Sequence, residues 1–595
     1  MKRTLAVALI TCLFVLGACA HKQGKNPSGV ANPGFQGAVP EDVAQADCVP
    51  GTYGGTLVIG TPHNPQTFNM ITALFASSTW VIDHIIFNSI VGYDNYAQKV
   101  APELAKSWEA SPDGLTWTIH LRKGVRWSDG APFNCDDVIF SYQVMSDPEI
   151  ASPERNTFVQ SDGTVPVIEK VDDYTFRFHL KDPADMVPAL NDFHPIPKHK
   201  WESVYKAGNF RNAMSISSDP SDVVGTGPYR LVSFKADQQI TLERNPYYWK
   251  VDSKHQRLPY IDRVVFLIVP DNNTWNLKME NGDIDLYIQI QQGVDEVRRF
   301  ETKGDYKVYD LGPSLTVNFL AFNQDTGNDK NGKHFVDPVK LKWFRDVKFR
   351  QAVEYAIDRD AIIRTALNGR GKPIWTPDSP AIKLWAFDPP MKRPYNPEIA
   401  KELLKEIGIY DRNGDGIAED GDGHPVKFSL MTNSNNSVRV NMVTLIKENL
   451  KNVGLDVNLD LIDPNLMSNR MQFSRDFDAM LSSWQAGVPP DPIEGKDQLL
   501  PTGESYAAFP RQKTPSTEWE KQLLDLLNKS MGTNDLANRQ KYYRQAMQIW
   551  TDYLPEIDLV SPEAFAAAKN SVGNLKPSAL PNFVEWNIDE LYFKY

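Results

Sequence analysis

The sequence predicts an α/β protein of several domains, built from open sheets with helices on their faces. Three observations lead to this prediction. The chain has 595 residues, more than one hydrophobic core organises, so two to four domains are expected. Its composition, 41% hydrophobic and 23% charged, is that of a soluble globular protein. The second half alternates helical and strand patterns, and repeated units of this kind build sheets with crevices at the strand ends.

The first residues predict an export signal over residues 1–18. Lys2 and Arg3 precede an apolar run over residues 5–16, which is too short to span a bilayer. The run ends in Leu-Gly-Ala-Cys, with Cys19 last, and this spacing resembles a bacterial lipobox. The resemblance implies that Cys19 becomes the new N-terminus and carries lipid. We therefore expect a protein of the periplasm or cell surface, anchored to a membrane but not spanning it.

Residues 19–51 are predicted to form the lipid anchor and a flexible tether. The segment is rich in Gly, Pro, Ala, Asn and Gln, and such a composition buries too little apolar surface to fold. Cys48 and Cys135 are the remaining cysteines beyond the signal and Cys19. Outside the cytoplasm a disulfide between them is allowed, and two separate thiols are the alternative.

The first half of the globular chain shows strand patterns and one helix pattern. Residues 55–60 predict a strand after a glycine turn. Residues 117–121 and 174–180 alternate apolar and polar side chains, which predicts strands with one dry face. Ser78 is predicted to cap a helix. The apolar face of that helix would consist of Val81, Ile82, Ile85 and Ile86.

The second half alternates helices and strands. Asp346 and Asn396 are predicted to cap two helices, the second with a proline at its first position. A third helix ends at Gly454, and residues 455–461 then alternate strictly as a strand. Thr517 and Glu520 predict a capping box. A long helix is predicted over 536–553.

Several blocks of the sequence resemble one protein family. They include Leu104-AKSWEASPDGLTWTIHLRKGVRWSDGAPFNCDDVIFS-Tyr142, Val224-Gly-Thr-Gly-Pro-Tyr229 and Arg350-QAVEYAID-Arg359. These blocks resemble the family 5 extracellular solute-binding proteins, the receptor subunits of peptide and nickel ABC importers. They occur in the family's order, and the resemblance covers nearly everything from about residue 54 to the end.

The resemblance implies a periplasmic-binding-protein-like fold, with two lobes around a ligand cleft and a third, smaller domain packed on the first lobe. The first lobe would be discontinuous. By resemblance, lobe I comprises residues 52–92, 215–312 and 560–595, the extra domain 93–214, and lobe II 313–559.

The resemblance also points to a ligand-binding segment at the end of one strand. In peptide-binding members this segment pairs with the ligand backbone as an added strand. The matching residues are Trp484, Gln485, Ala486 and Gly487. Many oligopeptide binders carry an Asp three residues after the Trp, which pairs with the peptide amine, and often an Arg three residues before it. This chain has Gly487 and Leu481 there. Asp491 is a candidate substitute for the amine partner, and a turn residue before proline is the alternative.

Five further residues are candidate ligand contacts at strand ends near the hinge. Tyr287 and Gln289 follow one strand, Asn318 lies on the strand that enters lobe II, and Asn64 and Phe68 follow the first strand. Each of them also has a purely structural reading, because a polar residue late in a strand often satisfies a backbone group.

Other functional classes find little support. A net charge of -12 argues against nucleic acid as a partner. Residues 411–422 resemble a calcium loop, but a Gly/Asp-rich turn also fits and is the reading we favour. His194 and His199 are five positions apart, off the helical spacing for a shared metal, so nickel is disfavoured. The chain contains neither GxSxG nor HExxH, and we expect no catalytic site, metal or cofactor.

The predicted function is that of a monomeric, lipid-anchored receptor that delivers an oligopeptide or peptide-like solute to an ABC permease. An oligosaccharide is the alternative solute, because sugars stack on aromatic rings and Trp, Tyr and Phe are frequent in this chain. A surface hydrolase and a sensory receptor on the same scaffold are the rivals from other classes.

Overall fold

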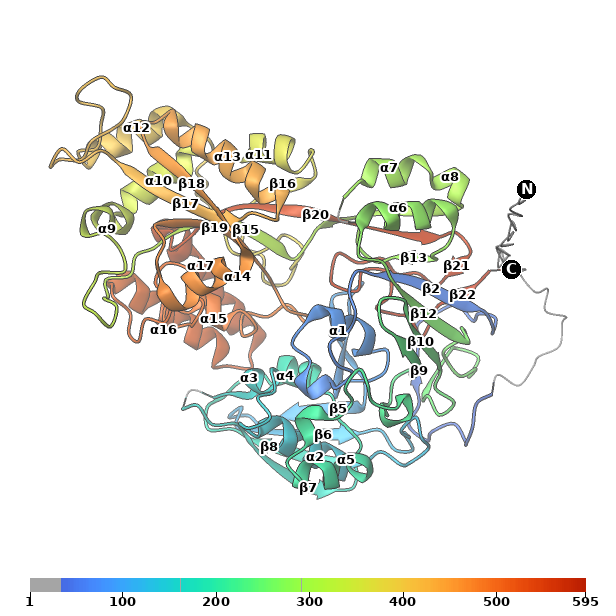
Figure 1. The fold of residues 1–595 in the computed structure, drawn as a ribbon. Helices are drawn as coiled ribbons and strands as arrows, with labels where there is room; N and C mark the ends of the chain where they lie inside the picture. The colour runs from blue at the N-terminus through green and yellow to red at the C-terminus, as the bar shows by residue number, and fades with distance from the viewer. Residues whose placement is uncertain (1–33, 161, 291, 595) are drawn as a thin grey trace, which may run out of the picture.

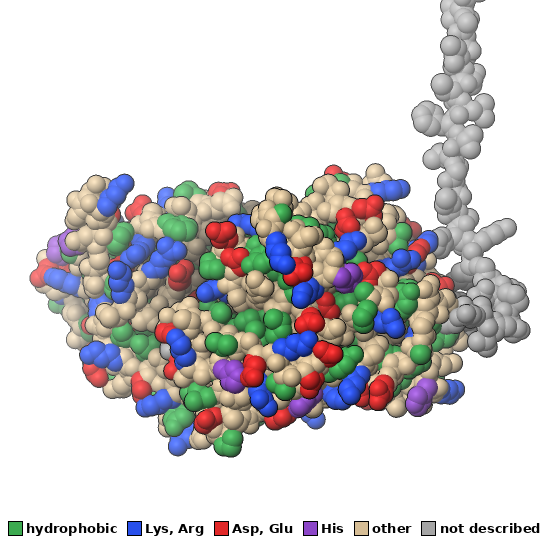
Figure 2. Space-filling model, turned by 90° about the horizontal axis from the view of Figure 1, so that it is seen from below, with side chains coloured by type: hydrophobic (Ala, Val, Ile, Leu, Met, Phe, Trp, Pro, Cys, Tyr) green, Lys and Arg blue, Asp and Glu red, His purple; other side chains and the backbone are tan. Residues whose placement is uncertain are grey.

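The computed structural model describes residues 34–160, 162–290 and 292–594. The predicted export signal and the lipidation site Cys19 lie outside the described residues. The chain forms two large lobes with a smaller body below them, and strand β20 runs between the lobes (Figure 1). From below, acidic and basic side chains of the described residues are interspersed over the surface (Figure 2).

One large sheet runs through both lobes. Its strands in spatial order are β18 (Asp456–Ile462), β17 (Lys427–Asn433), β19 (Ala479–Gln485), β15 (Thr316–Phe322), β20 (Ile557–Lys569), β13 (Leu286–Tyr287), β2 (Thr56–Thr61), β12 (Arg263–Ile268), β10 (Gln239–Arg244) and β9 (Tyr229–Lys235). β14 (Tyr306–Pro313) and β16 (Gly371–Pro373) also pair with β20. We call the part with β2, β9, β10, β12 and β13 lobe I, and the part with β15, β17, β18 and β19 lobe II.

β20 belongs to both lobes. Its first half pairs with β15 and β16 in lobe II, and its second half pairs with β13 and β14 in lobe I. The chain crosses a second time between β14 and β15, where Ser314 donates its backbone N–H to the carbonyl of Pro562. These two crossing points are the natural hinge for any movement of the lobes.

Several helices predicted for lobe II are confirmed. Asp346 and Asn396 cap α10 (Val347–Ala356) and α12 (Pro397–Glu406) through their side chains. α13 (Ser437–Lys451) leads to strand β18, and α17 spans Leu536–Tyr553 as predicted. Thr517 caps α16 (Glu518–Met531) by accepting the N–H of Glu520. The remaining helices of this lobe are α9 (Pro338–Arg345), α11 (Arg359–Ala366), α14 (Pro464–Asn469) and α15 (Lys496–Leu499).

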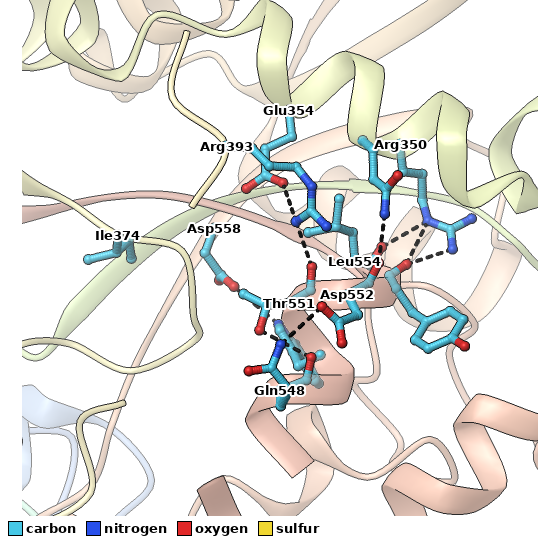
Figure 3. Close-up of polar contacts among 12 residues, drawn as sticks. Arg350, Glu354, Ile374, Arg393, Gln548, Thr551, Asp552, Leu554 and Asp558 are labelled. Carbon is cyan, nitrogen blue, oxygen red and sulfur yellow. Dashed lines mark hydrogen bonds and ion pairs between the residues drawn. The ribbon is translucent and has the colours of Figure 1, made fainter. Parts of the chain in front are cut away.

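Two buried arginines fix the end of α17 and therefore the start of β20 (Figure 3). The last carbonyls of a helix have no partner within the helix. Arg350 donates to the carbonyls of Tyr553 and Leu554, and Arg393 donates to that of Thr551. Glu354 lies 3.2 Å from Arg393 and balances its charge. The Arg350–Arg359 sequence block is therefore explained by this junction, which holds the crossing strand in lobe II.

The helix predicted to be capped by Ser78 differs from the prediction. α1 spans Ala76–Ile82, so Ser78 lies inside it and accepts the backbone N–H of Gln66 instead. The helix stops before Ile85, where Asp83 is extended and His84 has a positive φ. The carbonyls of Ile85 and Ile86 instead accept the N–H groups of Tyr229 and Gly227.

The smaller body, which we call the small domain (residues 105–206), has its own four-stranded sheet. The strand order is β5 (Ala105–Ala110), β6 (Thr116–Leu121), β8 (Thr175–His179) and β7 (Val167–Asp172). The helices of this domain are α2 (Cys135–Ser146), α3 (Arg155–Phe158), α4 (Val187–Asp192) and α5 (Lys198–Lys206). Buried His194 joins it to lobe I, with ring nitrogens 2.9 Å from Asp83 and 3.1 Å from Glu154. Although burial opposes the charge, these carboxylates raise the pKa of His194 well above its usual value, so the imidazolium is a fixed cation in this joint.

The expectation of a flexible tether is wrong for residues 34–51. Ala44–Gln45 forms strand β1, which pairs in parallel with β11 (Lys250–Val251), and Gln36 donates its N–H to the carbonyl of Pro246. The backbone itself supplies these bonds, so a composition poor in apolar residues does not prevent the segment from packing on lobe I. Cys48 and Cys135 are separate thiols rather than a disulfide.

The acidic loop 411–422 forms turns. Asp411 accepts the backbone N–H groups of Gly414 and Gly416, and residues 410 and 419 pair as an isolated bridge. Among the described residues, no helix combines the length and the apolar character needed to cross a membrane.

Candidate functional site

Two cavities adjoin at the end of β19. The larger, which we call the main cavity, has a volume of about 450 Å³ and lies between lobe I and residues 485–488 of lobe II. The smaller, the side cavity, measures about 50 Å³ and lies within lobe II. Residues 485–487 line both cavities, so the end of this strand separates the two spaces.

The end of β19 has a free edge toward these cavities. On one side it pairs with β15 up to Thr316 and Gln485. On the other side β17 pairs with it only at residues 479 and 480. Among the described strands, none pairs with residues 482–485 on that second side. An edge of this kind presents main-chain N–H and C=O groups to an incoming extended chain.

The main cavity is polar, and carboxyl groups outnumber lysines on its wall. Lys250 lies 3.3 Å from Glu103 and 3.4 Å from Asp589, and Lys576 lies 2.7 Å from Glu590. Its wall also includes Tyr93, Trp586 and other aromatic or amide side chains. Because carboxyl groups outnumber lysines on this wall, the space suits a neutral or cationic polar solute better than an anionic one.

The side cavity has three carboxyl groups on its wall. Asp491 lies 2.5 Å from the guanidinium of Arg539. Asp378 accepts the hydroxyl hydrogen of Tyr543 at 2.6 Å, and burial raises the pKa of Asp378 to about 7. The third carboxyl belongs to Glu494, whose Oε1 is shielded from solvent and accepts no hydrogen bond from the described residues. Trp385 and Trp484 complete the wall with flat rings.

The small domain reaches across to lobe II beside these cavities. Arg539 of α17 lies 2.7 Å from Asp185, and Lys496 donates to the carbonyl of Asn156 at 2.8 Å. These contacts close the side of the cleft that faces away from the hinge. The small domain therefore contributes to the enclosure of the site, although it is attached to lobe I.

The residues predicted on the strand end and the loop that follows it come together in the structure. Trp484, Gln485, Ala486, Gly487 and Asp491 line the side cavity. Asp491 is bound to Arg539, which reduces its capacity to pair with a solute.

The other five predicted contacts do not line either cavity. Tyr287 and Phe68 are fully buried in lobe I, and Asn318 is buried with its amide donating to the carbonyl of Val560. Asn64 bonds to the loop at 237. Gln289 is half-buried beyond the end of β13.

Sequence reasoning missed residues that the fold brings to the site from elsewhere in the chain. Asp378, Trp385 and Tyr543 line the side cavity, and Lys250 and Trp586 line the main cavity. They are scattered along the chain, and no local pattern distinguishes them. Glu494 was the easiest of the missed residues to predict, since it follows the predicted strand end by less than ten residues.

Comparisons with known proteins agree with this geometry. The family model of bacterial extracellular solute-binding proteins, family 5 Middle, matches residues 99–506. A probable ABC transporter-binding protein of Deinococcus radiodurans is 28% identical, over 84% of this chain and 86% of its own. The oligopeptide-binding protein AppA of Bacillus subtilis is 28% identical, over 92% and 90%. Heme-binding protein A of Haemophilus influenzae is 30% identical, over 95% of both chains.

Solved structures of the family share the fold. AppA of Bacillus subtilis in complex with a nonapeptide superposes with a TM-score of 0.69 at 25% identity, covering 92% of this chain and 100% of its own. The predicted α/β, periplasmic-binding-protein-like fold is thereby confirmed. The relatives are solute-binding components of ABC transporters, and this role extends to the present chain. The family match over more than half of the sequence establishes that the chain belongs to the bacterial extracellular solute-binding proteins of family 5.

Proposed function

We propose that the protein is a lipid-anchored receptor that captures an oligopeptide or peptide-like solute and delivers it to an ABC permease. Cys19 carries the lipid, and the receptor works as a monomer in the periplasm or at the cell surface. Lobe I comprises residues 52–92, 215–312 and 560–595, the extra domain 93–214, and lobe II 313–559.

The free edge of β19 is the observation that carries the peptide assignment. A peptide has a backbone that can extend a sheet, whereas haem or a sugar has none. Main-chain hydrogen bonds supply affinity without regard to side chains, so the receptor accepts varied sequences. A main cavity of about 450 Å³ has room for a short peptide, since ligand pockets usually measure roughly 300 to 1,000 Å³.

Closure around the solute follows from the two crossing points of the chain. Lobe II moves against lobe I about β20 and the β14–β15 junction, and the solute favours the closed state because it contacts both lobes only there. The small domain closes the outer side through Arg539 and Asp185.

A binding experiment with the full chain tests the proposal. A tetrapeptide library of random sequence and a library of linear oligosaccharides are presented separately, and bound masses are read by native mass spectrometry. We expect a ladder of peptide masses, and weaker binding of at least about tenfold when internal amides of the peptides are N-methylated. Retention of the sugar library instead would move the assignment to oligosaccharides. Hydrolysis of the bound library would favour a surface hydrolase.

A further inference from the structure

The N-terminal segment that packs on lobe I also reaches the main cavity. We call residues 35–47 the strap. Residues 44–47 of the strap lie on the wall of this cavity, together with residues 485–488 at the end of β19. The strap and the end of β19 therefore border one space from different lobes, although they come from distant parts of the chain.

Arginine contacts hold the start of the strap on lobe I. The ring centre of Phe35 lies 5.3 Å from the guanidinium of Arg244 and 5.7 Å from that of Arg257. Arg257 also donates to the carbonyl of Gln36 at 2.8 Å, and Tyr247 donates its hydroxyl hydrogen to the Gln36 side chain at 2.6 Å. A guanidinium group is attracted to the face of an aromatic ring, so these contacts fix the place of the first residues.

The rest of the strap is fixed to the small domain and to the C-terminal segment. Lys106 lies 2.9 Å from the carboxylate of Asp42, and Arg122 donates to the Asp42 carbonyl at 3.2 Å. At the other end, the backbone carbonyl of Asp47 accepts a hydrogen bond from Lys576 at 2.8 Å. Because three parts of the fold hold the strap, its cavity-lining residues have a defined position.

Side chains alternate at the end of the strap. Ala44 and Ala46 pack against the core of lobe I, whereas Gln45 and Asp47 are exposed. Successive side chains of an extended chain point to opposite faces, so Gln45 and Asp47 point away from that core, on the side of the cavity that they line. β1 pairs with β11, and among the described strands none pairs with its opposite edge. Both main-chain groups and polar side chains are therefore available to a solute.

The carboxylate of Asp47 has no basic partner in the unliganded cavity. Lys576 pairs with Glu590 at 2.7 Å. Lys250, the other lysine of the wall, pairs with Glu103 at 3.3 Å. The described residues give the Asp47 carboxylate neither an ion pair nor a hydrogen bond. Since carboxyl groups outnumber lysines on this wall, a cation that enters the cavity is attracted toward Asp47.

We propose that the strap is a wall of the solute site, where Gln45 and Asp47 contact the solute and Asp47 selects a cationic side chain. The inference rests on the proposed peptide function and names a side-chain preference of that same site. Main-chain pairing at β19 does not distinguish sequences, so a preference among peptides has to come from other parts of the wall. Because Cys19 precedes the strap in the sequence, the segment that leads to the proposed lipid anchor then also contacts the solute.

Competition between two tetrapeptide libraries tests the proposal on the full chain. In one library every peptide contains a single lysine, and in the other norleucine, which has the same aliphatic chain without the amine, replaces it. Native mass spectrometry measures the ratio of the bound masses. Wild type should retain the lysine library about threefold over the norleucine library, and Asp47→Asn should bring this ratio close to one. Glu41→Gln, at an exposed carboxylate of the same strap that does not line the cavity, is the matched control.

Two further measurements separate contact with the solute from a structural role. Bound tetrapeptides should slow hydrogen exchange at the amides of Gln45 and Asp47 by at least about threefold, and leave exchange in the distant loop 411–422 unchanged. The melting temperature of Asp47→Asn without solute should equal that of wild type, because the exposed carboxylate has no bonded partner to lose.

The outcomes separate the two proposals. If wild type binds both libraries equally, or if Asp47→Asn keeps the preference for lysine, the role of Asp47 is overturned while the peptide receptor stands. Unchanged exchange at Gln45 and Asp47 in the bound protein would overturn the strap as a wall of the site. If wild type binds neither library, the peptide assignment fails, and the peptide contact of the strap fails with it.

Discussion

The guanidinium of Arg539 and the carboxylate of Asp185 lie 2.7 Å apart, although 354 positions separate them in the chain. Arg539 belongs to α17 in lobe II, and Asp185 belongs to the small domain. The arginine is 2% exposed and the aspartate 22%, so solvent screens the pair only in part. The same guanidinium holds Asp491 on the loop after β19. The small domain is thereby coupled to the wall of the side cavity.

We expect Asp185→Asn to speed the release of bound tetrapeptides. A partly buried ion pair across a closing cleft contributes about 1 kcal/mol, so the dissociation rate should rise roughly fivefold. Stopped-flow displacement of the bound peptide measures this rate. Glu169→Gln, an exposed change in the same domain, should leave it unchanged. An unaltered rate in Asp185→Asn would show that the pair does not hold the closed state.

The buried carboxyl of Asp378 should give the protein a pH-dependent stability. Its pKa is raised to about 7 by burial, so the folded state holds a proton that the unfolded state gives up between about pH 4 and about pH 7. Stability from this group therefore falls as pH rises through that window. Asp378→Asn keeps an acceptor for Tyr543 and removes the titration.

The measured quantity is the free energy of unfolding of Asp378→Asn minus that of wild type. This difference should be more positive at about pH 8 than at about pH 5, by an amount on the order of 1–4 kcal/mol. Urea unfolding at the two pH values measures the difference, with exposed Asp497→Asn as the control. A constant difference between the variant and wild type at both pH values would contradict the prediction.

Gly225 is required by a close approach of two backbones. A Cβ atom there would lie 1.8 Å from the carbonyl oxygen of Ile86, closer than any non-bonded contact allows. We expect Gly225→Ala to cost at least about 3 kcal/mol and to leave little soluble protein. Gly421→Ala should express as wild type does, because a Cβ atom added there would have no neighbour within 4 Å. Normal yield and melting temperature for Gly225→Ala would show that the Ile86 segment moves freely.

Arg350 should stabilise the end of α17 through the shape of its side chain. It donates to the carbonyls of Phe344, Tyr553 and Leu554, and a lysine cannot reach three acceptors in this fork. We expect Arg350→Lys to lower the free energy of unfolding by about 2–4 kcal/mol, since buried carbonyls lose their partners. Urea unfolding followed by tryptophan fluorescence measures the loss. Lys348→Arg, on the exposed face of the same helix, is the control.

Local patterns predicted much of the fold but only part of the site. The bounds of α17 and the alternation in β18 depend on neighbours in the sequence, so they were readable. The residues from Trp484 to Gly487 were found because a family resemblance marks that strand end. Glu494 was missed because its position depends on the absence of a side chain at Gly487, a relation that appears only once the loop folds back.

The helix predicted to be capped by Ser78 is a case in which a local pattern predicted more helix than the structure contains. Its apolar spacing continues to Ile86, yet the carbonyls there bond to Gly227 and Tyr229, more than a hundred residues later. Long-range backbone bonds of this kind override a local period. The segment 34–51 was misjudged for the same reason, since strand β11 orders it.

Because β20 pairs with both lobes, the length of this strand is constrained more strictly than its amino-acid sequence. Loss or gain of a single residue would turn every later side chain of the strand to the opposite face of the sheet. A deletion earlier in the strand would bring Lys569 to the position of buried Ala568, and an insertion would bring Phe565 to the position of buried Ala566. Relatives should therefore differ in length at surface loops such as 411–422, while insertions and deletions within 557–569 are eliminated by selection.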